Sequence, residues 1–441
     1  MAGIYFISLG CDKNRIDAEI MANALIEAGH FVTGNLESAD CAVINTCGFI
    51  ESAKKEAIDN IFDMVRAKQR GDIKAIVITG CLAERYRDEL CELVPEADAV
   101  IGLAANKDIV MAVESALKSR KFTRYGPPEC LEISGERALS TPQHYAYIKI
   151  AEGCSNHCTY CAIPSIRGHY RSRMPSEIVA EARALAERGV RELIVIAQDT
   201  TSYGVDLSSG ETLPSLLREL CSIDDLWRIR VLYAYPERIT NELIATMASE
   251  EKIAKYLDIP LQHANPNVLR RMGRQGDGKT YLELIDKLRA AMPDITLRSS
   301  FIVGFPGESD AEFEELLEFL SRAHIDRAGC FAFSCEEGTP AEKLALQIED
   351  DIKQLRVERF ESAQSAILSR ALDSKVDTVF EVICDGFDEE CGMFACRGDA
   401  DAPEIDTCVY LPAESDLMPG EIYSVVITAA DGQDLLARLA L

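Results

Sequence analysis

The chain has 441 residues, of which 47% are hydrophobic and 27% are charged, a composition typical of a soluble globular protein of about three domains. No apolar run approaches the roughly 20 residues that cross a bilayer, and residues 1–7 lack the basic stretch that opens a signal peptide. The sequence therefore predicts a cytoplasmic protein with no membrane partner. The net charge of −27 disfavours a grip on nucleic-acid phosphates and favours either a basic protein partner or an acidic surface that only aids solubility.

The first segment, residues 1–120, alternates short apolar runs with helical patterns. The strands are expected at residues 4–9, 41–46 and 74–79, the helices at 14–29, 51–69 and 83–93, and a fourth strand–helix unit at 97–120. Such alternation predicts a parallel sheet with helices on its faces. Residues 121–139 contain a Gly-Pro-Pro stretch and are interpreted as a linker.

The second segment, residues 140–372, repeats the strand–helix pattern at greater length. Six strands are expected, at residues 145–150, 192–197, 228–233, 256–260, 296–303 and 329–334, and a long helix at 350–372 closes the segment. The pattern predicts a partial (β/α)6 barrel related to the TIM barrel, with its active site at the carboxyl ends of the strands.

The tail, residues 373–441, has short alternating strands at 376–383, 406–411 and 422–428 and no long helical pattern. It is predicted to form a small antiparallel β-barrel. The tail contains 16 acidic and 3 basic residues, so nearly half of the net charge of the chain lies in it. This localised acidity favours a docking role toward a basic partner over solubility alone.

A C-x3-C-x2-C triplet, Cys154, Cys158 and Cys161, follows the first strand of the second segment. Sixteen cysteines in a long cytosolic chain indicate metal or cluster ligation rather than disulfides. A fully ligated four-iron cluster takes four thiolates, so three leave one iron open for a reacting ligand. Zinc is the main alternative, with His157 as a fourth ligand, but structural zinc sites favour paired C-x2-C knuckles.

The triplet, the six strand–helix units and the segment at 302–308 together resemble the radical S-adenosylmethionine (SAM) superfamily. The resemblance implies a 4Fe–4S cluster whose open iron binds the amino and carboxylate groups of SAM. It also implies that an electron from the cluster splits a carbon–sulfur bond to give a 5′-deoxyadenosyl radical, which abstracts hydrogen from substrate.

Several polar or glycine residues near strand ends are candidates for binding SAM. Gly304, Gly307 and Glu308 follow the fifth strand and resemble the adenine-contacting loop of the superfamily. The other candidates are Gln198, Gln262 and Arg298, and an arginine could pair with the SAM carboxylate. For each single residue, an ordinary polar strand end is the equally simple alternative.

A second group of cysteines lies in the first segment. Cys11, Cys47 and Cys81 each follow a predicted strand by no more than two residues. Because parallel strands end at one edge of a sheet, three thiols could converge there. Spacing alone is moderate evidence, since Cys41 and Cys91 show that other cysteines occur nearby.

With these cysteines included, the whole chain resembles the methylthiotransferase family. The resemblance implies a second 4Fe–4S cluster on Cys11, Cys47 and Cys81, where sulfur and methyl group are assembled, with a second SAM as methyl donor. One branch of that family modifies transfer-RNA adenosine. The other modifies an aspartate β-carbon of the small-subunit ribosomal protein S-twelve.

The acidic tail decides between the two substrates in favour of the basic ribosomal protein, free or in the ribosome. Residues 397–406 also resemble the tail of that branch, although the aromatic residue usual near Gly398 is absent. The tail is not expected to grip RNA, and the electron donor is expected to be of flavodoxin or ferredoxin type. A transfer-RNA methylthiotransferase and a non-catalytic iron–sulfur electron carrier remain as alternatives. A zinc site on Cys384, Cys391, Cys396 and Cys408 is conceivable, but incidental thiols are the simpler interpretation.

Overall fold

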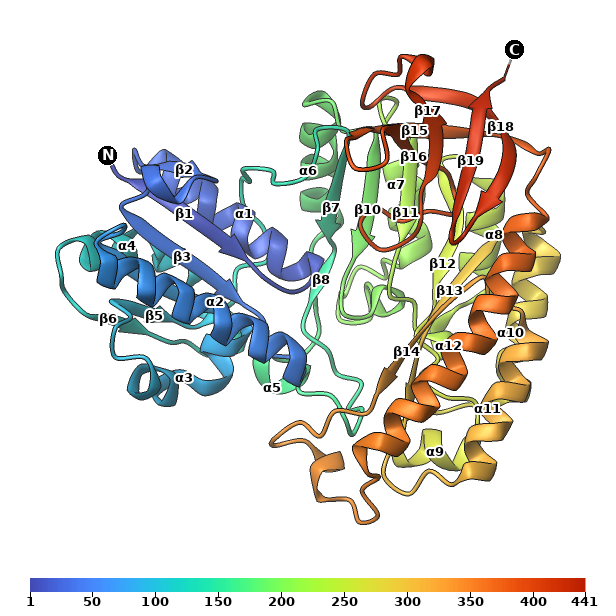
Figure 1. The fold of residues 1–441 in the computed structure, drawn as a ribbon, viewed down its shortest axis with the longest axis horizontal. Coiled ribbons are helices and arrows are strands. Elements are labelled where there is room, and N and C mark those ends of the chain that lie inside the picture. The colour runs from blue at the N-terminus through green and yellow to red at the C-terminus, as the bar shows by residue number, and fades with distance from the viewer. Residues whose placement is uncertain (441) are drawn as a thin grey trace.

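The computed structural model describes residues 1–440, which form an N-terminal sheet domain, a central open barrel and a C-terminal closed barrel (Figure 1). This arrangement confirms the mixed α/β fold class expected from the sequence. No helix in the described residues is both long and apolar enough to cross a membrane.

The N-terminal body is a six-stranded parallel sheet in the order β2-β1-β3-β4-β5-β6. The strands β3 and β4 are buried along their whole length because helices cover both faces of the sheet. The strands are β1 (Gly3–Ser8), β2 (Phe31–Thr33), β3 (Cys41–Thr46), β4 (Ala75–Gly80), β5 (Ala99–Ile101) and β6 (Phe122–Arg124), and the helices are α1 (Asp12–Glu27), α2 (Glu51–Arg70), α3 (Cys81–Leu93) and α4 (Ile109–Leu117).

The central body is a six-stranded parallel sheet in the order β14-β13-β12-β11-β10-β7, so its edge strands stay apart and the barrel is open. A single large apolar core fills the space between this sheet and its outer helices. The strands are β7 (Tyr145–Lys149), β10 (Glu192–Ile196), β11 (Arg228–Val231), β12 (Ile253–Asp258), β13 (Thr296–Val303) and β14 (Arg327–Ala332), and the outer helices are α6 (Pro175–Glu187), α7 (Leu213–Cys221), α8 (Asn241–Ser249), α10 (Gly278–Ala291), α11 (Asp310–Ala323) and α12 (Asp350–Asp373).

Four short elements complete this body: β8 (Ala151–Glu152), α5 (Ile163–Arg167), β9 (Arg171–Ser172) and α9 (Pro266–Arg271). The strands β8 and β9 pair with each other, so they bring the two ends of the cysteine loop together. Helix α1 of the N-terminal body packs against the edge strand β7, which places that body beside the open side of the barrel (Figure 1).

The C-terminal body is a closed barrel of five strands, β15 (Val379–Asp388), β16 (Met393–Arg397), β17 (Val409–Pro412), β18 (Ile422–Asp431) and β19 (Asp434–Leu439). Neighbouring strands are antiparallel except for β17 and β19, which pair in parallel where the barrel closes. Three of these strands are predicted from the sequence, whereas β16 and β19 are not, because their short runs are stabilised by pairing within the barrel.

Residues 398–407 of the C-terminal body, here the plug loop, enter the central barrel where its strands begin. Ala402 is fully buried among barrel side chains that include Tyr145, Ile194 and Tyr256. Arg230 of β11 donates to the carbonyl oxygens of Gly398 and Asp399 at the start of the loop. The plug loop therefore fixes the C-terminal body to the central barrel.

The plug loop also neutralises part of the acidity of the tail. Its carboxylates pair with arginines of the other two bodies: Asp399 with Arg228 at 2.8 Å, Asp401 with Arg327 at 2.6 Å, Asp406 with Arg298 at 3.6 Å and Glu404 with Arg15 at 2.6 Å. The exposed carboxylates that remain include those of Glu389, Glu390, Glu414, Asp416 and Glu421 on the barrel surface. Some carboxylates of the tail thus form internal ion pairs, and others stay exposed on the barrel surface.

We expect Ala402→Phe to destabilise the protein, because the added ring has no room in the packed space under the plug loop and overpacking costs about 1–3 kcal/mol. The thermal unfolding midpoint should fall. Ala413→Phe, at an exposed position of the same body, should stay within about 0.5 kcal/mol of wild type. An unchanged midpoint for Ala402→Phe would show that the loop does not fill the barrel.

The stability of the protein should depend on pH through Asp385. Burial raises the pKa of Asp385, but the hydrogen bond from His144 and the charge of Arg397 outweigh it and leave the pKa below its ordinary value. Because the pKa is depressed on folding, the contribution of Asp385 is present above the unfolded value of about 3.9 and is lost as pH falls through the folded value. The difference in midpoint between wild type and Asp385→Asn should shrink as pH falls from about 7 to about 3. A constant difference would contradict this assignment.

Candidate functional site

The cysteine triplet of the central body lies in an irregular loop between β8 and α5, at the carboxyl end of β7. Gly153 has φ +77°, and a Cβ there would stand 2.2 Å from the carbonyl oxygen of His169, so the loop can begin only with glycine. The amide of Cys154 donates to Gly168, and that of Thr159 donates to Met272 just beyond α9. Hydrogen bonds from two sides therefore fix the loop.

The thiols of the triplet are placed where hydrogen-bond donors can reach them. Backbone amides donate to the sulfurs of Cys154 and Cys161, and the hydroxyl of Tyr235 lies 2.8 Å from the sulfur of Cys158. Burial nevertheless raises the pKa of Cys154 to about 11 and that of Cys161 to about 12. Binding of a cationic centre would displace the protons of these thiols, as it does for cysteine ligands in general.

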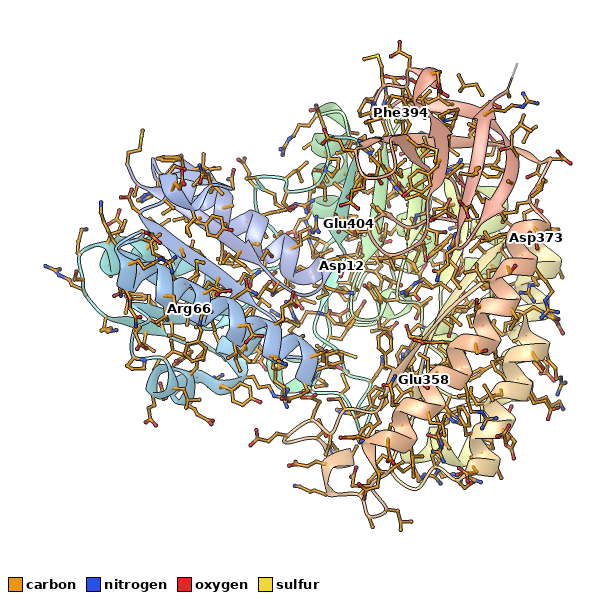
Figure 2. All side chains as sticks on the ribbon, viewed as in Figure 1. Asp12, Arg66, Glu358, Asp373, Phe394 and Glu404 are labelled. Carbon is orange, nitrogen blue, oxygen red and sulfur yellow. The ribbon has the colours of Figure 1, made fainter. Side chains whose placement is uncertain are left out.

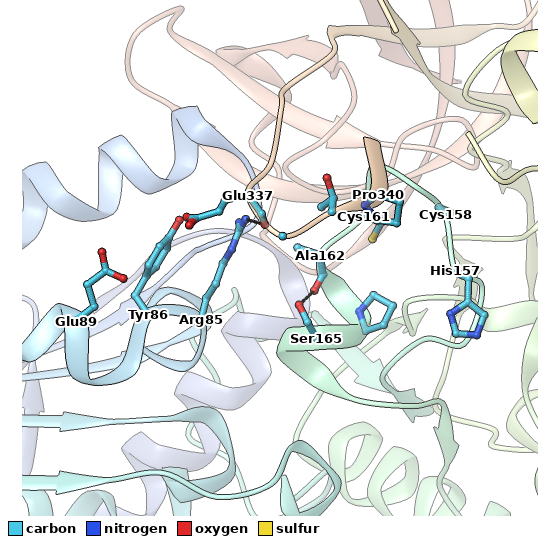
Figure 3. Close-up of a pocket in the computed structure, with 13 residues that line it drawn as sticks. Arg85, Tyr86, Glu89, His157, Cys158, Cys161, Ala162, Ser165, Glu337 and Pro340 are labelled. Atoms are coloured by element: carbon cyan, nitrogen blue, oxygen red, sulfur yellow. Dashed lines mark hydrogen bonds between the residues drawn. The ribbon is translucent and has the colours of Figure 1, made fainter. Parts of the chain in front are cut away.

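A cavity of about 470 Å³ opens beside the triplet (Figure 3). His157, Cys158 and Cys161 line one side, and α3 of the N-terminal body contributes Arg85 and Tyr86. Arg85 donates to the carbonyl oxygen of Gly48 and pairs with Glu336 at 2.8 Å, in the segment that follows β14. The cavity thus lies at the contact between the N-terminal body and the central barrel.

The second cysteine trio lies along one edge of the N-terminal sheet. Cys11 immediately precedes α1, Cys47 follows β3, and Cys81 begins α3 directly after β4. Gly10 has φ +93°, and a Cβ there would stand 3.0 Å from the sulfur of Cys47, so the residue beside Cys11 touches Cys47. The structure brings the strand ends that carry the three thiols to one place.

Asn14 and Arg167 organise this trio. The Asn14 amide donates to the carbonyl oxygens of Leu9 and Thr46, at the ends of β1 and β3. Burial raises the pKa of Cys81 to about 12, and the nearby Arg167 charge opposes that rise. The sulfur of Cys81 is thus buried and faces a cation.

The two trios lie on facing surfaces of one interface. Cys81 belongs to the same apolar cluster as Ala162, the neighbour of Cys161, and as Ile166 of α5. A second cavity, of about 420 Å³, is lined by Cys11, Asp12 and Glu404, and these last two residues lie at the meeting point of the three bodies (Figure 2). Both trios therefore border cavities between bodies.

The residues expected to bind SAM differ in whether their polar groups already have partners within the chain. Gln198 donates to Glu152 at 2.7 Å, and its own buried amide oxygen has no hydrogen-bond partner in the described residues. Gln262 has φ +69° and bridges to β13 through its backbone. Arg298 is held by Asp258 at 3.0 Å and by Asp406 of the plug loop at 3.6 Å.

The loop after β13 is a tight turn. Gly304 has φ +72°, and a Cβ there would stand 2.3 Å from the side chain of Lys353 in α12. Gly307 has φ +75°. Glu308 is buried and accepts a hydrogen bond from the amide of Phe305 at 2.9 Å, so its carboxylate holds the turn closed.

Two residues of the site carry no recognisable signal in the sequence. Asp17 and Lys149 meet at 2.7 Å at the interface of the two bodies, where both are buried. Asp17 lies within an ordinary helical pattern, and Lys149 within a strand, so only the tertiary structure shows that they pair. Within residues 1–440, no three Cys, His, Asp or Glu side chains are grouped to hold a single metal ion.

Comparisons with known proteins agree with this architecture. Residues 148–320 match the Radical SAM superfamily, residues 3–102 match the Uncharacterized protein family UPF0004, and residues 376–440 match the TRAM domain. A radical S-adenosylmethionine methyltransferase, TsrM, from Kitasatospora setae has a similar fold, with a TM-score of 0.57 and 14% identity, over 77% of each chain. The central body and its cysteine loop therefore define a radical SAM protein.

Three relatives are named "Ribosomal protein uS12 methylthiotransferase RimO". The relative from Lachnoclostridium phytofermentans is 43% identical over 98% of this chain and 99% of its own. The relatives from Desulforudis audaxviator and Clostridioides difficile are 46% and 42% identical, over 99% of this chain and 96% and 98% of their own. The chain belongs to the RimO family of radical SAM methylthiotransferases.

Membership of this family confirms the resemblance found in the sequence and makes the chain an enzyme of the transferase class rather than an electron carrier. It also brings with it a 4Fe–4S cluster and SAM, the cofactors of the superfamily. The cysteine loop fits such a cluster, because its three thiols come from a single short segment and amides donate to the sulfurs of two of them, Cys154 and Cys161.

Proposed function

We propose that the protein adds a methylthio group to the β-carbon of an aspartate in ribosomal protein uS12. The observation that carries the proposal is the placement of two cysteine trios across one interface, with Cys81 and Ala162 in the same apolar cluster. The substrate is supported by the names of relatives that match nearly the whole chain, and by the exposed carboxylates of the C-terminal barrel, which suit a basic protein.

In this proposal each trio holds one 4Fe–4S cluster. Cys154, Cys158 and Cys161 hold one in the central barrel. Cys11, Cys47 and Cys81 hold the other in the N-terminal sheet domain, and this second cluster is called the auxiliary cluster. When bound, the clusters and SAM supply the electron, the 5′-deoxyadenosyl radical, the sulfur and the methyl group. The proposal divides the chain into residues 1–120, a connection at 121–139 whose strand β6 pairs with the N-terminal sheet, the core at 140–372 and the barrel at 373–441.

The residues of the chain hold and orient these groups. Amides donate to the sulfurs of Cys154 and Cys161, which favours their charged form. The residues proposed to contact SAM are Gln198, with its unpartnered amide oxygen, Gln262, Arg298, Gly304, Gly307 and Glu308. Arg298 and Glu308 also have partners within the chain, Asp258 and the amide of Phe305, which hold these two side chains in place.

The partners follow from the same chemistry. The enzyme acts in the cytoplasm on uS12, free or within the ribosome, and takes its electron from a small donor of flavodoxin or ferredoxin type. The barrel offers acidic groups rather than the lysines and arginines that grip RNA. A transfer-RNA adenosine methylthiotransferase is therefore the second candidate, and only its substrate differs.

The substrate is tested by incubating the reduced, reconstituted enzyme and SAM with uS12 and with transfer RNA in separate reactions. We expect a mass gain on uS12 equal to one methylthio group replacing one hydrogen, and none on RNA. Cys154→Ala serves as the control and should give no gain on either. A gain on RNA alone would contradict the proposal.

The two-cluster assignment is tested by iron content. Anaerobically reconstituted wild type should hold about eight irons per chain, as two 4Fe–4S clusters require. Replacing Cys154, Cys158 and Cys161 together by alanine should leave about four, and so should replacing Cys11, Cys47 and Cys81. Cys41→Ala, at a buried cysteine outside both trios, should change nothing. About four irons in wild type would refute the second cluster.

A further inference from the structure

Four charged side chains form a closed group in the interface between the N-terminal body and the barrel. Lys149 of β7 lies 2.7 Å from both Asp17 of α1 and Glu152 of β8, and Arg167 of α5 lies 2.9 Å from Asp17 and 3.0 Å from Glu152. All four side chains are at most 1% exposed. We call this group the buried quartet, and its formal charges sum to zero.

Arg167 is the member of the quartet that reaches a cysteine. Its Nη2 atom lies 3.6 Å from the sulfur of Cys81 and 3.4 Å from Oδ1 of Asn14. The same side chain belongs to the short helix that follows the loop of Cys154, Cys158 and Cys161. The guanidinium of Arg167 thus contacts Cys81, while the backbone of Arg167 belongs to the helix that follows the loop of the other cysteine trio.

Stability alone does not explain such a group. Burying four ionic side chains carries a desolvation cost that close pairing only offsets, and apolar residues of similar size often serve a fold as well or better. A guanidinium is also charged at every accessible pH, so Arg167 places a permanent positive charge beside Cys81. A fixed charge in a dry interface acts strongly on any neighbouring group whose charge changes.

We propose that Arg167 is a positioning residue that raises the reduction potential of the auxiliary cluster through the charge it holds against the sulfur of Cys81. The proposal rests on the assignment of Cys11, Cys47 and Cys81 as ligands of that cluster. It adds a role for a residue that binds neither SAM nor substrate.

The sign of the effect follows from charge. One-electron reduction takes a 4Fe–4S cluster from its 2+ to its 1+ core, with the electron supplied by an external low-potential reductant and no change of ligands. The product is more negative by one unit, so a nearby cation stabilises it and a nearby anion destabilises it. Arg167 therefore raises the potential, whereas Asp17, which pairs with it, lowers it.

A purely structural role makes a different prediction. If Arg167 only joined the two bodies, removing its charge or that of Asp17 would loosen the same interface. Both changes would then shift the potential in the same direction, or leave it unchanged. Opposite shifts from two neighbouring positions require an electrostatic action on the cluster.

The test is a redox titration of the auxiliary cluster followed by electron paramagnetic resonance. The background is the full-length chain with Cys154, Cys158 and Cys161 replaced by alanine, reconstituted with iron and sulfide and titrated with dithionite through viologen mediators. Into it we place Arg167→Gln, Arg167→Lys and Asp17→Asn. Arg230→Gln is the matched control, because Arg230 is equally buried and paired, with Glu192, but at the plug loop.

We expect a lower potential for Arg167→Gln, a smaller decrease for Arg167→Lys, a higher potential for Asp17→Asn and no change for Arg230→Gln. Potentials that stay at the background value in Arg167→Gln and Asp17→Asn, with the iron content retained, would overturn the inference while leaving the proposed function intact. If Arg167→Gln does not hold its iron, the near-isosteric Asp17→Asn decides, and an unchanged or lowered potential there overturns the inference. Absence of any cluster in the background chain would refute the proposed ligation itself, and the inference with it.

Discussion

The contact between helix α1 and the edge strand β7 depends on ion pairs that are buried completely. Asp17 of the N-terminal body pairs with Lys149 and Arg167 of the barrel, and both of these cations also pair with Glu152. Separating the two bodies would expose or strand four charges at once, so this interface has one favoured register. Everything proposed for the site depends on that register, because the two cysteine trios belong to different bodies and come together only across it.

The plug loop places a similar constraint at the other end of the barrel. Its carboxylates and carbonyl oxygens pair with arginines at the starts of the barrel strands, among them Arg230 and Arg327. The C-terminal barrel is thus held rigidly to the core, so the carboxylates on its outer surface have a fixed orientation relative to the site. A docking surface for a basic protein benefits from this rigidity, since less freedom is lost on binding.

Much of the fold could be predicted from the sequence, because buried parallel strands such as β3 and β4 are continuous apolar runs. The six cysteines could be singled out by their spacing or by their position after strands. Short edge strands such as β2 could not, since residues 31–33 are mostly exposed and carry little pattern. The pairing of Asp17 with Arg167 joins residues 150 positions apart, and the internal use of Asp399, Asp401 and Asp406 depends on where the plug loop lies. Neither is encoded locally.

The central claim is that two clusters face each other across one interface. The most direct measurement is the electron paramagnetic resonance spectrum of the fully reduced, reconstituted protein. We predict spin–spin coupling between two paramagnetic clusters, which disappears when alanine replaces either the trio of Cys154, Cys158 and Cys161 or that of Cys11, Cys47 and Cys81. Two independent signals whose sum reproduces the spectrum of the intact protein would contradict the account.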